Sequence, residues 1–250
     1  MLDGDRIATL VARHFSELLR QCQIKLVGSD ETPSGDALCV GVVQTAYANG
    51  NSTAYLNEQA KIPVAVTPTG VKHLHHKALD FDIGVYFEAN GHGTVVFSQR
   101  AEDLLSSKSS SEEATIKSAA KTMLAFIQLV NQSVGDAVAD MLMVLVILAQ
   151  SGRGMPEWIK EYTELPSIQA KLPVNDRTKF KTNADETRLV EPSSLQSKID
   201  ELVKEVPQGR AFIRPSGTEN VVRIYAEAQN REDVDKLTKN LSSEVESLGY

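Results

Sequence analysis

The sequence predicts an α/β protein, with a mixed-sheet three-layer sandwich followed by a small two-layer α+β domain. Between residues 37 and 98, short apolar runs alternate with helical patterns, which is the order of elements in a layered α/β domain. Valines run through residues 37–44, as expected for a strand that is buried on both faces. Prolines punctuate residues 164–173 and mark a boundary, after which a shorter series of strands and helices follows.

The first region begins with a predicted helix over residues 5–19, because Ile7, Leu10 and other apolar residues recur there at helical spacing. Asp3 or Asp5 could cap this helix by accepting hydrogen bonds from its free N–H groups. Similar patterns predict the other elements of this region: strands over 37–44, 63–66, 82–88 and 94–98, and helices over 71–79, 114–130, 136–149 and 155–162. Residues 106–113 are rich in serine and charge and are expected to be a surface loop or the entry to a helix.

The second region is predicted to be a small α+β unit. Its strands and helices are expected over 179–182, 195–203, 210–213, 221–227 and 233–247, in the order strand, helix, strand, strand, helix. A unit of this kind forms two layers.

Composition excludes several classes of protein. The net charge of −7 argues against general nucleic-acid or membrane binding, because phosphate-rich partners would be repelled. The longest apolar run, residues 137–149, is too short to span a bilayer, and the N-terminus has no signal-peptide pattern. Cys22 and Cys39 form no Cys-x-x-Cys pair, which argues against a disulfide scaffold. We therefore expect a cytoplasmic protein with no nucleic-acid or membrane partner.

The most informative stretch lies near the C-terminus, where a predicted strand delivers Arg214 to a turn. Pro215 and Gly217 form this turn, and Ser216 and Thr218 supply hydroxyl groups. Such a turn can point successive backbone N–H groups at an anion, and the arginine fork matches phosphate oxygens. On local chemistry alone the alternative is an ordinary β-hairpin, because Gly/Ser/Thr turns are common.

Arg223 follows in the next predicted strand, where it alternates with Val222 and Ile224. Successive side chains of a strand point to opposite faces, so Arg223 projects away from these two apolar neighbours. It could therefore return to the same anion site as the turn before it.

A second polar loop follows the strand predicted over residues 82–88. Glu88 and Asn90 lie there, beside Ala89 and His92, in a glycine-containing string. In open α/β sheets, ligands bind beyond the carboxyl ends of strands. The carboxylate can accept hydrogen bonds from two sugar hydroxyls, and the amide can donate and accept. Taken in isolation, the string equally describes a tight glycine turn.

The two loops resemble two loops of the α-D-phosphohexomutase superfamily. The string Arg-Pro-Ser-Gly-Thr-Glu, residues 214–219, is similar to its phosphate-binding loop. The string Phe-Glu-Ala-Asn-Gly-His-Gly, residues 87–93, is similar to its sugar-binding loop, with Asn90 in place of the serine that most members carry. That replacement, and the flanking strings 44–50 and 69–77, resemble the phosphoacetylglucosamine mutase branch.

The resemblance covers essentially the whole chain and implies a domain organisation. Residues 1–15 would be the end of the superfamily's second domain, 16–165 its third, sugar-recognition domain, and 172–250 its C-terminal, phosphate-binding domain. The substrate-binding residues would be Glu88, Ala89, Asn90, Arg214, Pro215, Ser216, Gly217, Thr218 and Arg223, with Lys72 and His92 as further candidates.

Two catalytic parts of the family have no match. No Ser-His-Asn string occurs, so the phosphorylated serine of the family's enzymes is absent and no catalytic residue is predicted. Asp3-Gly4-Asp5-Arg6 falls one aspartate short of the family's magnesium loop, and magnesium needs several oxygen ligands in near-octahedral geometry. The histidines at 73, 75 and 76 lack an acidic or cysteine partner nearby, so no metal ligand is predicted. Mg²⁺ is expected only in the complete enzyme.

The resemblance thus implies an isomerase that interconverts N-acetylglucosamine 6-phosphate and N-acetylglucosamine 1-phosphate through a phosphoserine and a bisphosphate intermediate. This reaction belongs to UDP-N-acetylglucosamine biosynthesis. We expect the chain to carry the part that binds the phosphorylated N-acetylhexosamine and to be inactive alone, with the missing N-terminal half as a further partner. The alternative is a phosphosugar-binding module without catalysis.

Overall fold

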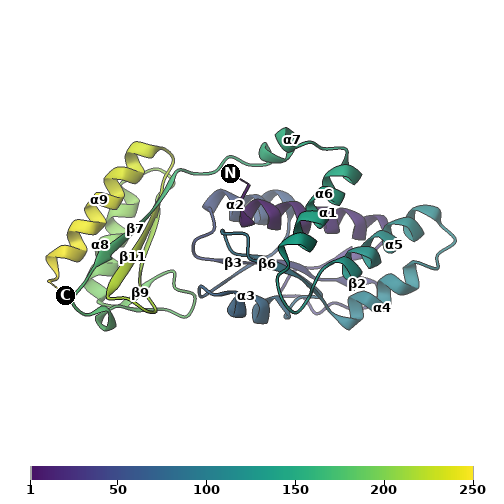
Figure 1. The fold of residues 1–250 in the computed structure, drawn as a ribbon, viewed down its shortest axis with the longest axis horizontal. Coiled ribbons are helices and arrows are strands. Elements are labelled where there is room, and N and C mark those ends of the chain that lie inside the picture. Colours follow the sequence, from purple (N-terminus) through teal and green to yellow (C-terminus); the bar gives the residue numbers. More distant parts are fainter. Residues whose placement is uncertain (1, 250) are drawn as a thin grey trace. The chain divides into compact units, whose positions relative to one another are not determined.

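The computed structural model describes residues 2–249, whose contacts group them into two units (Figure 1). Residues 2–48 and 52–163 form the first unit, and residues 49–51 join 164–249 in the second. The predicted fold class is confirmed, because the first unit is a mixed sheet between helical layers and the second is a two-layer α+β unit.

The first unit is built on a four-stranded sheet with the order β4-β3-β5-β6. Its strands are β3 (Val40–Thr45), β4 (Val64–Thr67), β5 (Ile83–Phe87) and β6 (Gly93–Phe97). β3 runs parallel to both of its neighbours, β4 and β5, whereas β6 is antiparallel to β5. Every residue of β3, β5 and β6 is buried, which explains their unbroken apolar runs.

Helices cover both faces of this sheet. One face carries α1 (Gly4–Gln21), α4 (Gln99–Lys108), α5 (Ala114–Leu129) and α6 (Ala137–Ser151). The rings of Phe15, Phe97 and Phe126 meet in the core of that face. The other face carries α3 (Val71–Ala78), whose Leu74 packs in a smaller cluster with Tyr86.

The remaining short elements are β1 (Lys25–Leu26), β2 (Ala37–Leu38), the π-helical turn η1 (Tyr55–Ala60) and α7 (Met155–Ile159) in the first unit, and α2 (Gly50–Ala54), whose first two residues belong to the second unit. At the start of α1, the Asp3 carboxylate accepts a 3.1 Å hydrogen bond from the Arg6 N–H, so Asp3 is the predicted cap. The helix packs on the sheet along its length, including the residues up to 15. The domain boundaries at residues 15 and 165 stay a prediction.

The second unit has a three-stranded antiparallel sheet with the order β10-β11-β7. Two helices cover one of its faces (Figure 1). Its elements are β7 (Ser167–Pro173), η2 (Arg177–Lys179), β8 (Lys181–Thr182), β9 (Leu189–Glu191), α8 (Ser193–Lys204), β10 (Arg210–Pro215), β11 (Val221–Glu227) and α9 (Arg231–Ser247).

Three segments differ from the sequence prediction. β7 lies in the stretch that we interpreted as a boundary. The strand was missed because its residues alternate between exposed and half-buried and a proline ends it. α4 occupies residues for which no helix was predicted and extends into the stretch expected to be a surface loop or a helix entry. The strand expected over 179–182 is a 3₁₀ turn followed by only two strand residues. None of the helices within residues 2–249 is long and apolar enough to cross a membrane.

Candidate functional site

The first polar loop lies at one edge of the four-stranded sheet. β3, β4 and β5 are parallel, so their carboxyl ends share that edge, and the loops after β4 and β5 lie side by side. The contact between them is direct: Glu88 Oε1 accepts a 3.1 Å hydrogen bond from the backbone N–H of Gly70. Gly70 has φ +126°, a value that glycine adopts without strain, and it precedes the first turn of α3.

The loop after β5 is closed by its own backbone. The N–H of Glu88 donates to the carbonyl of His92 at 2.9 Å, and the N–H of Gly91 donates to the carbonyl of Glu88 at 2.8 Å. Gly91 has φ +90°, in the region that favours glycine. Asn90 Oδ1 accepts a 2.8 Å bond from the His92 N–H, which leaves the amide nitrogen of this exposed residue to donate to a ligand.

Glycines allow the chain to pack tightly against this loop. The N–H of Gly4, in α1, donates to the carbonyl of Ala89 at 3.2 Å, and a Cβ on Gly4 would overlap the carbonyl oxygen of Glu88. On the other side, a Cβ on Gly135 would lie 2.5 Å from the carbonyl oxygen of Gly93. Backbone atoms therefore fix the position of Glu88 and Asn90.

The two further candidates, Lys72 and His92, are exposed near the same loops. Lys72 is the second residue of α3, two positions after Gly70. Neither side chain makes a hydrogen bond or ion pair within the described part of the chain. His92 lies four residues after Glu88, and Lys72 lies two residues after Gly70, which contacts Glu88.

The second polar loop, in the other unit, stands at the end of a row of cations. In the sheet register Arg214 pairs with Arg223, and Arg223 pairs with Lys171 of β7. Residues in direct register share a face, so three positive side chains lie next to one another. Val222 and Ile224 are fully buried on the opposite face, as the alternation predicted.

Like charges directly opposite in a sheet are destabilising unless an anion balances them. Two glutamates do so in part. Lys171 Nζ lies 2.6 Å from Glu219 Oε2, and Arg214 Nη1 lies 3.4 Å from Glu186 Oε2. Lys171 lowers the pKa of Glu219, with a smaller contribution from Arg223. The row is therefore a site of positive potential suited to a further anion.

The turn after β10 holds its hydroxyl group close to this row. Ser216 is buried, and its Oγ accepts long bonds of 3.4 Å from the N–H groups of Thr218 and Glu219. These contacts leave the Ser216 O–H proton as a donor. A Cβ on Gly217 would meet no atom within 4 Å, so the fold itself does not require glycine there. Pro215 ends β10 in register with Val222.

Two residues of this site were missed in the sequence. Lys171 lies in β7, which the sequence did not reveal as a strand, and Glu186 lies in the hairpin between β8 and β9. Their importance depends on strand register and on a tertiary ion pair. The only available signal was the alternation of polar and apolar residues over 167–173, which the flanking prolines obscured.

Farther along the same face of the second unit, Glu227 forms a closed polar network. Its buried carboxylate accepts hydrogen bonds from Arg210 Nε at 2.8 Å, from the Tyr225 hydroxyl at 2.6 Å and from the Gly50 N–H at 3.1 Å. Phe212 stacks on Tyr225, with ring centroids 5.1 Å apart. Because its acceptors are taken up, this network is structural.

No set of three or more histidine, cysteine, aspartate or glutamate side chains within residues 2–249 is arranged to hold a metal ion. The Asp3 carboxylate is used in capping α1, and His75 Nδ1 lies 2.9 Å from the Tyr86 hydroxyl. These residues do not fit a magnesium site.

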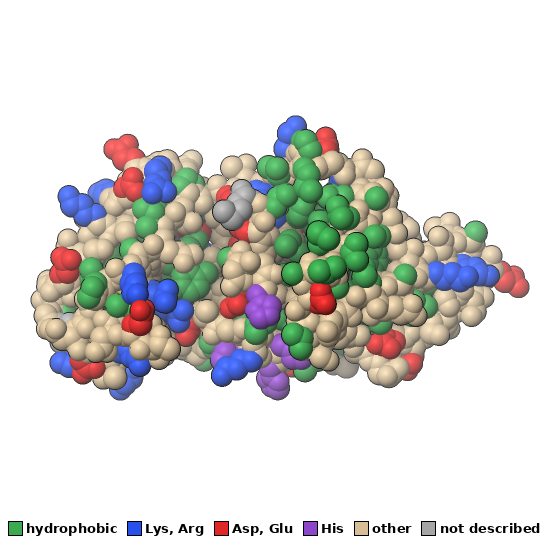
Figure 2. All heavy atoms as spheres, in the orientation of Figure 1, with side chains coloured by type: hydrophobic (Ala, Val, Ile, Leu, Met, Phe, Trp, Pro, Cys, Tyr) green, Lys and Arg blue, Asp and Glu red, His purple; other side chains and the backbone are tan. Residues whose placement is uncertain are grey.

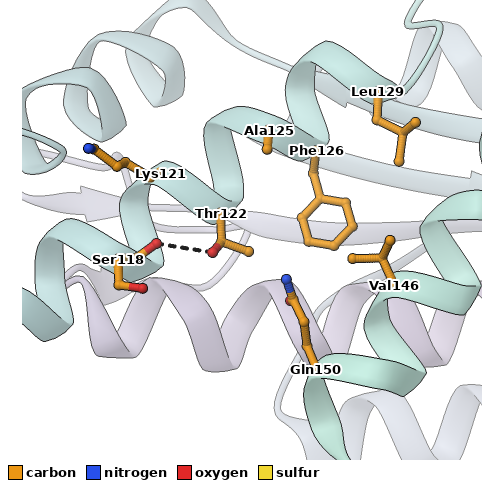
Figure 3. Close-up of a pocket in the computed structure, with 8 residues that line it drawn as sticks. All are labelled: Ser118, Lys121, Thr122, Ala125, Phe126, Leu129, Val146 and Gln150. Atoms are coloured by element: carbon orange, nitrogen blue, oxygen red, sulfur yellow. Dashed lines mark hydrogen bonds between the residues drawn. The ribbon is translucent and has the colours of Figure 1, made fainter.

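Two other surface features contain none of the predicted site residues. A hollow of about 490 Å³ lies between α5 and α6, lined mainly by apolar atoms, with Lys121 and Gln150 among its polar members (Figure 3). Hydrophobic side chains also gather over α6 (Figure 2). The exposed members on α6 and α7 are Val138, Met141, Leu142, Leu145, Val146, Met155 and Ile159.

The fold and the two loops assign the chain to the phosphohexomutase superfamily. Residues 163–243 match the phosphoglucomutase/phosphomannomutase C-terminal domain. Residues 3–153 match a narrower family, phosphoacetylglucosamine mutase AMG1, domain III. The chain therefore belongs to the phosphoacetylglucosamine mutase family.

Individual relatives agree with this assignment. The chain is 47% identical to phosphoacetylglucosamine mutase of Candida albicans over 98% of its own length and 43% of the relative's. It is 48% identical to the Homo sapiens protein, over 99% and 44%. A solved structure of Aspergillus fumigatus N-acetylphosphoglucosamine mutase, in complex with GlcNAc-6P and magnesium, matches with a TM-score of 0.90 and 45% identity over 98% of this chain and 47% of that one. The chain thus spans less than half the length of these relatives and corresponds to their C-terminal part.

Proposed function

We propose that this chain is the sugar- and phosphate-binding part of a phosphoacetylglucosamine mutase. Such an enzyme interconverts N-acetylglucosamine 6-phosphate and N-acetylglucosamine 1-phosphate, a step toward UDP-N-acetylglucosamine. The observation that carries the proposal is the row formed by Arg214, Arg223 and Lys171 at the end of the Arg-Pro-Ser-Gly-Thr-Glu turn. Cations and hydroxyl donors in this arrangement suit a phosphate monoester.

The two loops would divide the work of recognition. Arg214, Ser216, Thr218 and Arg223, with backbone N–H groups near Pro215 and Gly217, would hold the phosphate that is not reacting. Glu88 and Asn90, with the backbone of Ala89, would hold the sugar hydroxyl groups, since a carboxylate and an amide can bind them in either ligand orientation. Lys72 and His92 would contribute at the edge of this loop.

The proposal assigns no chemical step to this chain. In phosphoryl transfer a protein contributes mainly positioning and charge stabilisation, which these residues could supply. The resemblance implies a phosphoserine and Mg²⁺ elsewhere in the complete enzyme, and the described residues offer no metal site for the latter. We therefore propose that the chain is inactive alone and that its partners are a phosphorylated N-acetylhexosamine and the N-terminal half of the enzyme. Its two buried cysteines form no disulfide, which supports a cytoplasmic location.

The test is calorimetric titration of the purified chain with N-acetylglucosamine 6-phosphate, together with a coupled assay for isomerisation in the presence of Mg²⁺ and a trace of the bisphosphate. We expect binding without turnover, and a loss of affinity of roughly 10-fold or more in Arg223→Ala, because hydrogen bonds to a charged ligand contribute about 1.5–3 kcal/mol. Lys181→Ala, which removes an exposed cation of the same unit, is the matched control.

A different result would decide between the candidates. Turnover above background would contradict the claim that the reaction needs residues outside this chain. Binding that does not respond to Arg223→Ala would remove the proposed phosphate site. A non-catalytic phosphosugar-binding module is the second candidate, favoured by the same binding loops together with the absence of a matching catalytic serine string. It predicts that adding the N-terminal half of a relative on a separate chain restores no turnover.

A further inference from the structure

The hairpin between β8 and β9 places one carboxylate on the phosphate site. Arg214 Nη1 lies 3.4 Å from both oxygens of Glu186. The side chains of Arg214 and Glu186 are 14% and 23% exposed, so the pair is mostly shielded from water. Both distances are longer than the 2.6 Å between Lys171 and Glu219 in the same row. Glu186 therefore places a negative charge against Arg214.

The backbone of the hairpin is arranged around Glu186. Glu186 has φ +60°, in the left-handed region that costs a residue with a side chain about 1 kcal/mol or more. Its neighbours use their polar groups within the hairpin: the Thr187 hydroxyl donates to Asp185 Oδ1 at 2.6 Å, and Asn183 Oδ1 accepts from the Arg188 N–H at 3.0 Å. The Glu186 carboxylate lies against Arg214.

We propose that the Glu186 carboxylate competes with phosphate for Arg214, and that Glu186 turns away from Arg214 when a phosphate dianion binds. The inference rests on the proposed function, because it names how the same site selects its ligand. A carboxylate monoanion gains little by exchanging with Glu186, whose charge and geometry it shares. A phosphate monoester brings nearly two negative charges and three acceptor oxygens, so it can replace Glu186 on Arg214 and also engage Arg223. Glu186 thus determines specificity and keeps affinity moderate, which suits a ligand that must be released and rebound in a second orientation.

The experiment compares Glu186→Gln with the wild-type chain by calorimetric titration with inorganic phosphate and, separately, with N-acetylglucosamine 6-phosphate. We expect both ligands to bind roughly 3- to 10-fold more tightly to the variant, the range for a partly shielded competing charge. Acetate binding should rise from undetectable to measurable. Glu191→Gln is the matched control, since it removes the same charge from the same hairpin, where Glu191 pairs with the exposed Lys181, and it should change affinity less than 1.5-fold.

Two further variants separate competition from a structural role. Glu186→Gly removes the carboxylate and suits φ +60°, so it should tighten phosphate binding and leave the melting temperature unchanged or higher. Combining Glu186→Gln with Arg214→Ala should abolish the gain, because the effect acts through Arg214.

The outcomes are distinct. Weaker binding in Glu186→Gln would show that Glu186 positions Arg214 and would overturn the proposal. Equal gains in Glu186→Gln and Glu191→Gln would reduce it to a general charge effect and would also overturn it. A third outcome is that the sugar phosphate binds no better than inorganic phosphate, while Glu186→Gln increases the affinity for both ligands. In that case the proposed role of Glu186 is supported and the sugar-binding part of the proposed function fails. If no variant binds either ligand, both proposals fail.

Discussion

The loop after β5 and the loop after β10 are held in place by different forces. The loop of Glu88 and Asn90 is fixed by backbone hydrogen bonds and by glycines packed against carbonyl oxygens. The loop of Ser216 and Gly217 is also closed by backbone hydrogen bonds, including one from the Ser216 N–H to the Val221 carbonyl at 2.9 Å, but a Cβ on Gly217 would meet no atom within 4 Å and charged side chains surround the loop. The first loop is tightly packed on both sides, whereas the second has open space beside Gly217 and is surrounded by charges.

This difference predicts which perturbations each loop tolerates. A packed loop loses its shape when volume is added beneath it, because protein interiors are close-packed and respond to a single methyl group. An electrostatic loop keeps its shape but loses affinity when charge is removed or screened. The following substitutions test this contrast.

The largest effect is expected for Gly93→Val, at the end of the packed loop. A Cβ at Gly93 would overlap the carbonyl oxygen of Tyr86 and would lie 2.7 Å from the ring of Phe87. We expect a loss of stability of at least about 3 kcal/mol and a fall in melting temperature of roughly 6–12 °C, measured by circular dichroism. Gly217→Val is the control, and a comparable loss there would contradict the contrast between the loops.

The next effect concerns Asp140, in the first turn of α6. It is buried, its Oδ1 has no hydrogen-bond partner among residues 2–249, and burial raises its pKa from 3.8 to about 7, with a smaller contribution from Asp136. Burial raises the pKa of Tyr86, and the charge of Asp140 adds to that shift. Since the folded state holds the proton more tightly than the unfolded state, this group's contribution to stability is present below pH 4 and is lost as the pH rises to about 7.

Asp140→Asn should therefore stabilise the chain at pH 8 by an amount on the order of 2 kcal/mol, and the difference should vanish near pH 4. Thermal melts of both proteins across this pH range measure it. Asp136→Asn is the control, because the exposed Asp136 caps α6 through an oxygen that asparagine retains. A difference between Asp140→Asn and the wild type that is constant with pH would show that Asp140 does not titrate in this window.

A smaller effect is expected for Lys171→Met, at the outer end of the cationic row. Removing one half-exposed cation should weaken phosphate binding roughly 3-fold at low salt and less at 0.5 M salt, with the melting temperature nearly unchanged. Titration calorimetry at the two salt concentrations gives the comparison. Lys181→Met is its control, and an equal loss in that variant would mean that net charge, not position in the row, sets the affinity.

The smallest effect is expected for Lys72→Met. Lys72 is exposed and lies close to the Gly70 contact with Glu88. Its loss should weaken binding of N-acetylglucosamine 6-phosphate about 2-fold at low salt, because a solvated cation contributes little. Inorganic phosphate binding should not change. A 10-fold loss of affinity would instead make Lys72 a principal ligand of the sugar phosphate, together with Glu88 and Asn90.

Much of the fold could be predicted from the sequence, because its core elements carry strong patterns. The helix predicted over 5–19 is α1, and the strand predicted over 82–88 is β5. β7 could not be predicted, since an edge strand with alternating half-buried residues and a terminal proline resembles a linker. The sequence pattern of β7 is weak because its residues are only partly buried, and that burial depends on pairing with the neighbouring strand.

The candidate site divides in the same way. Arg214 could be predicted from the chemistry of its turn and Arg223 from strand alternation, and the two are register partners in the structure. The hydrogen bond from Gly70 to Glu88 follows from parallel strands ending at one edge of the sheet. Lys171 and Glu186 could not be identified, because they reach Arg214 and Arg223 only through strand pairing and a hairpin turn far away in the sequence.

The alternation of β11 has a consequence for how this sheet assembles. A slip of one residue against β10 or β7 would turn Arg223 into the apolar layer beneath the helices and expose Ile224 and Val222. The alternate register would bury a charge and expose one valine and one isoleucine side chain, so it is disfavoured during folding. The residues proposed to recognise phosphate therefore also favour the correct register of strand pairing. Replacing them with neutral residues would make a shifted register less unfavourable, even where the native fold keeps its stability.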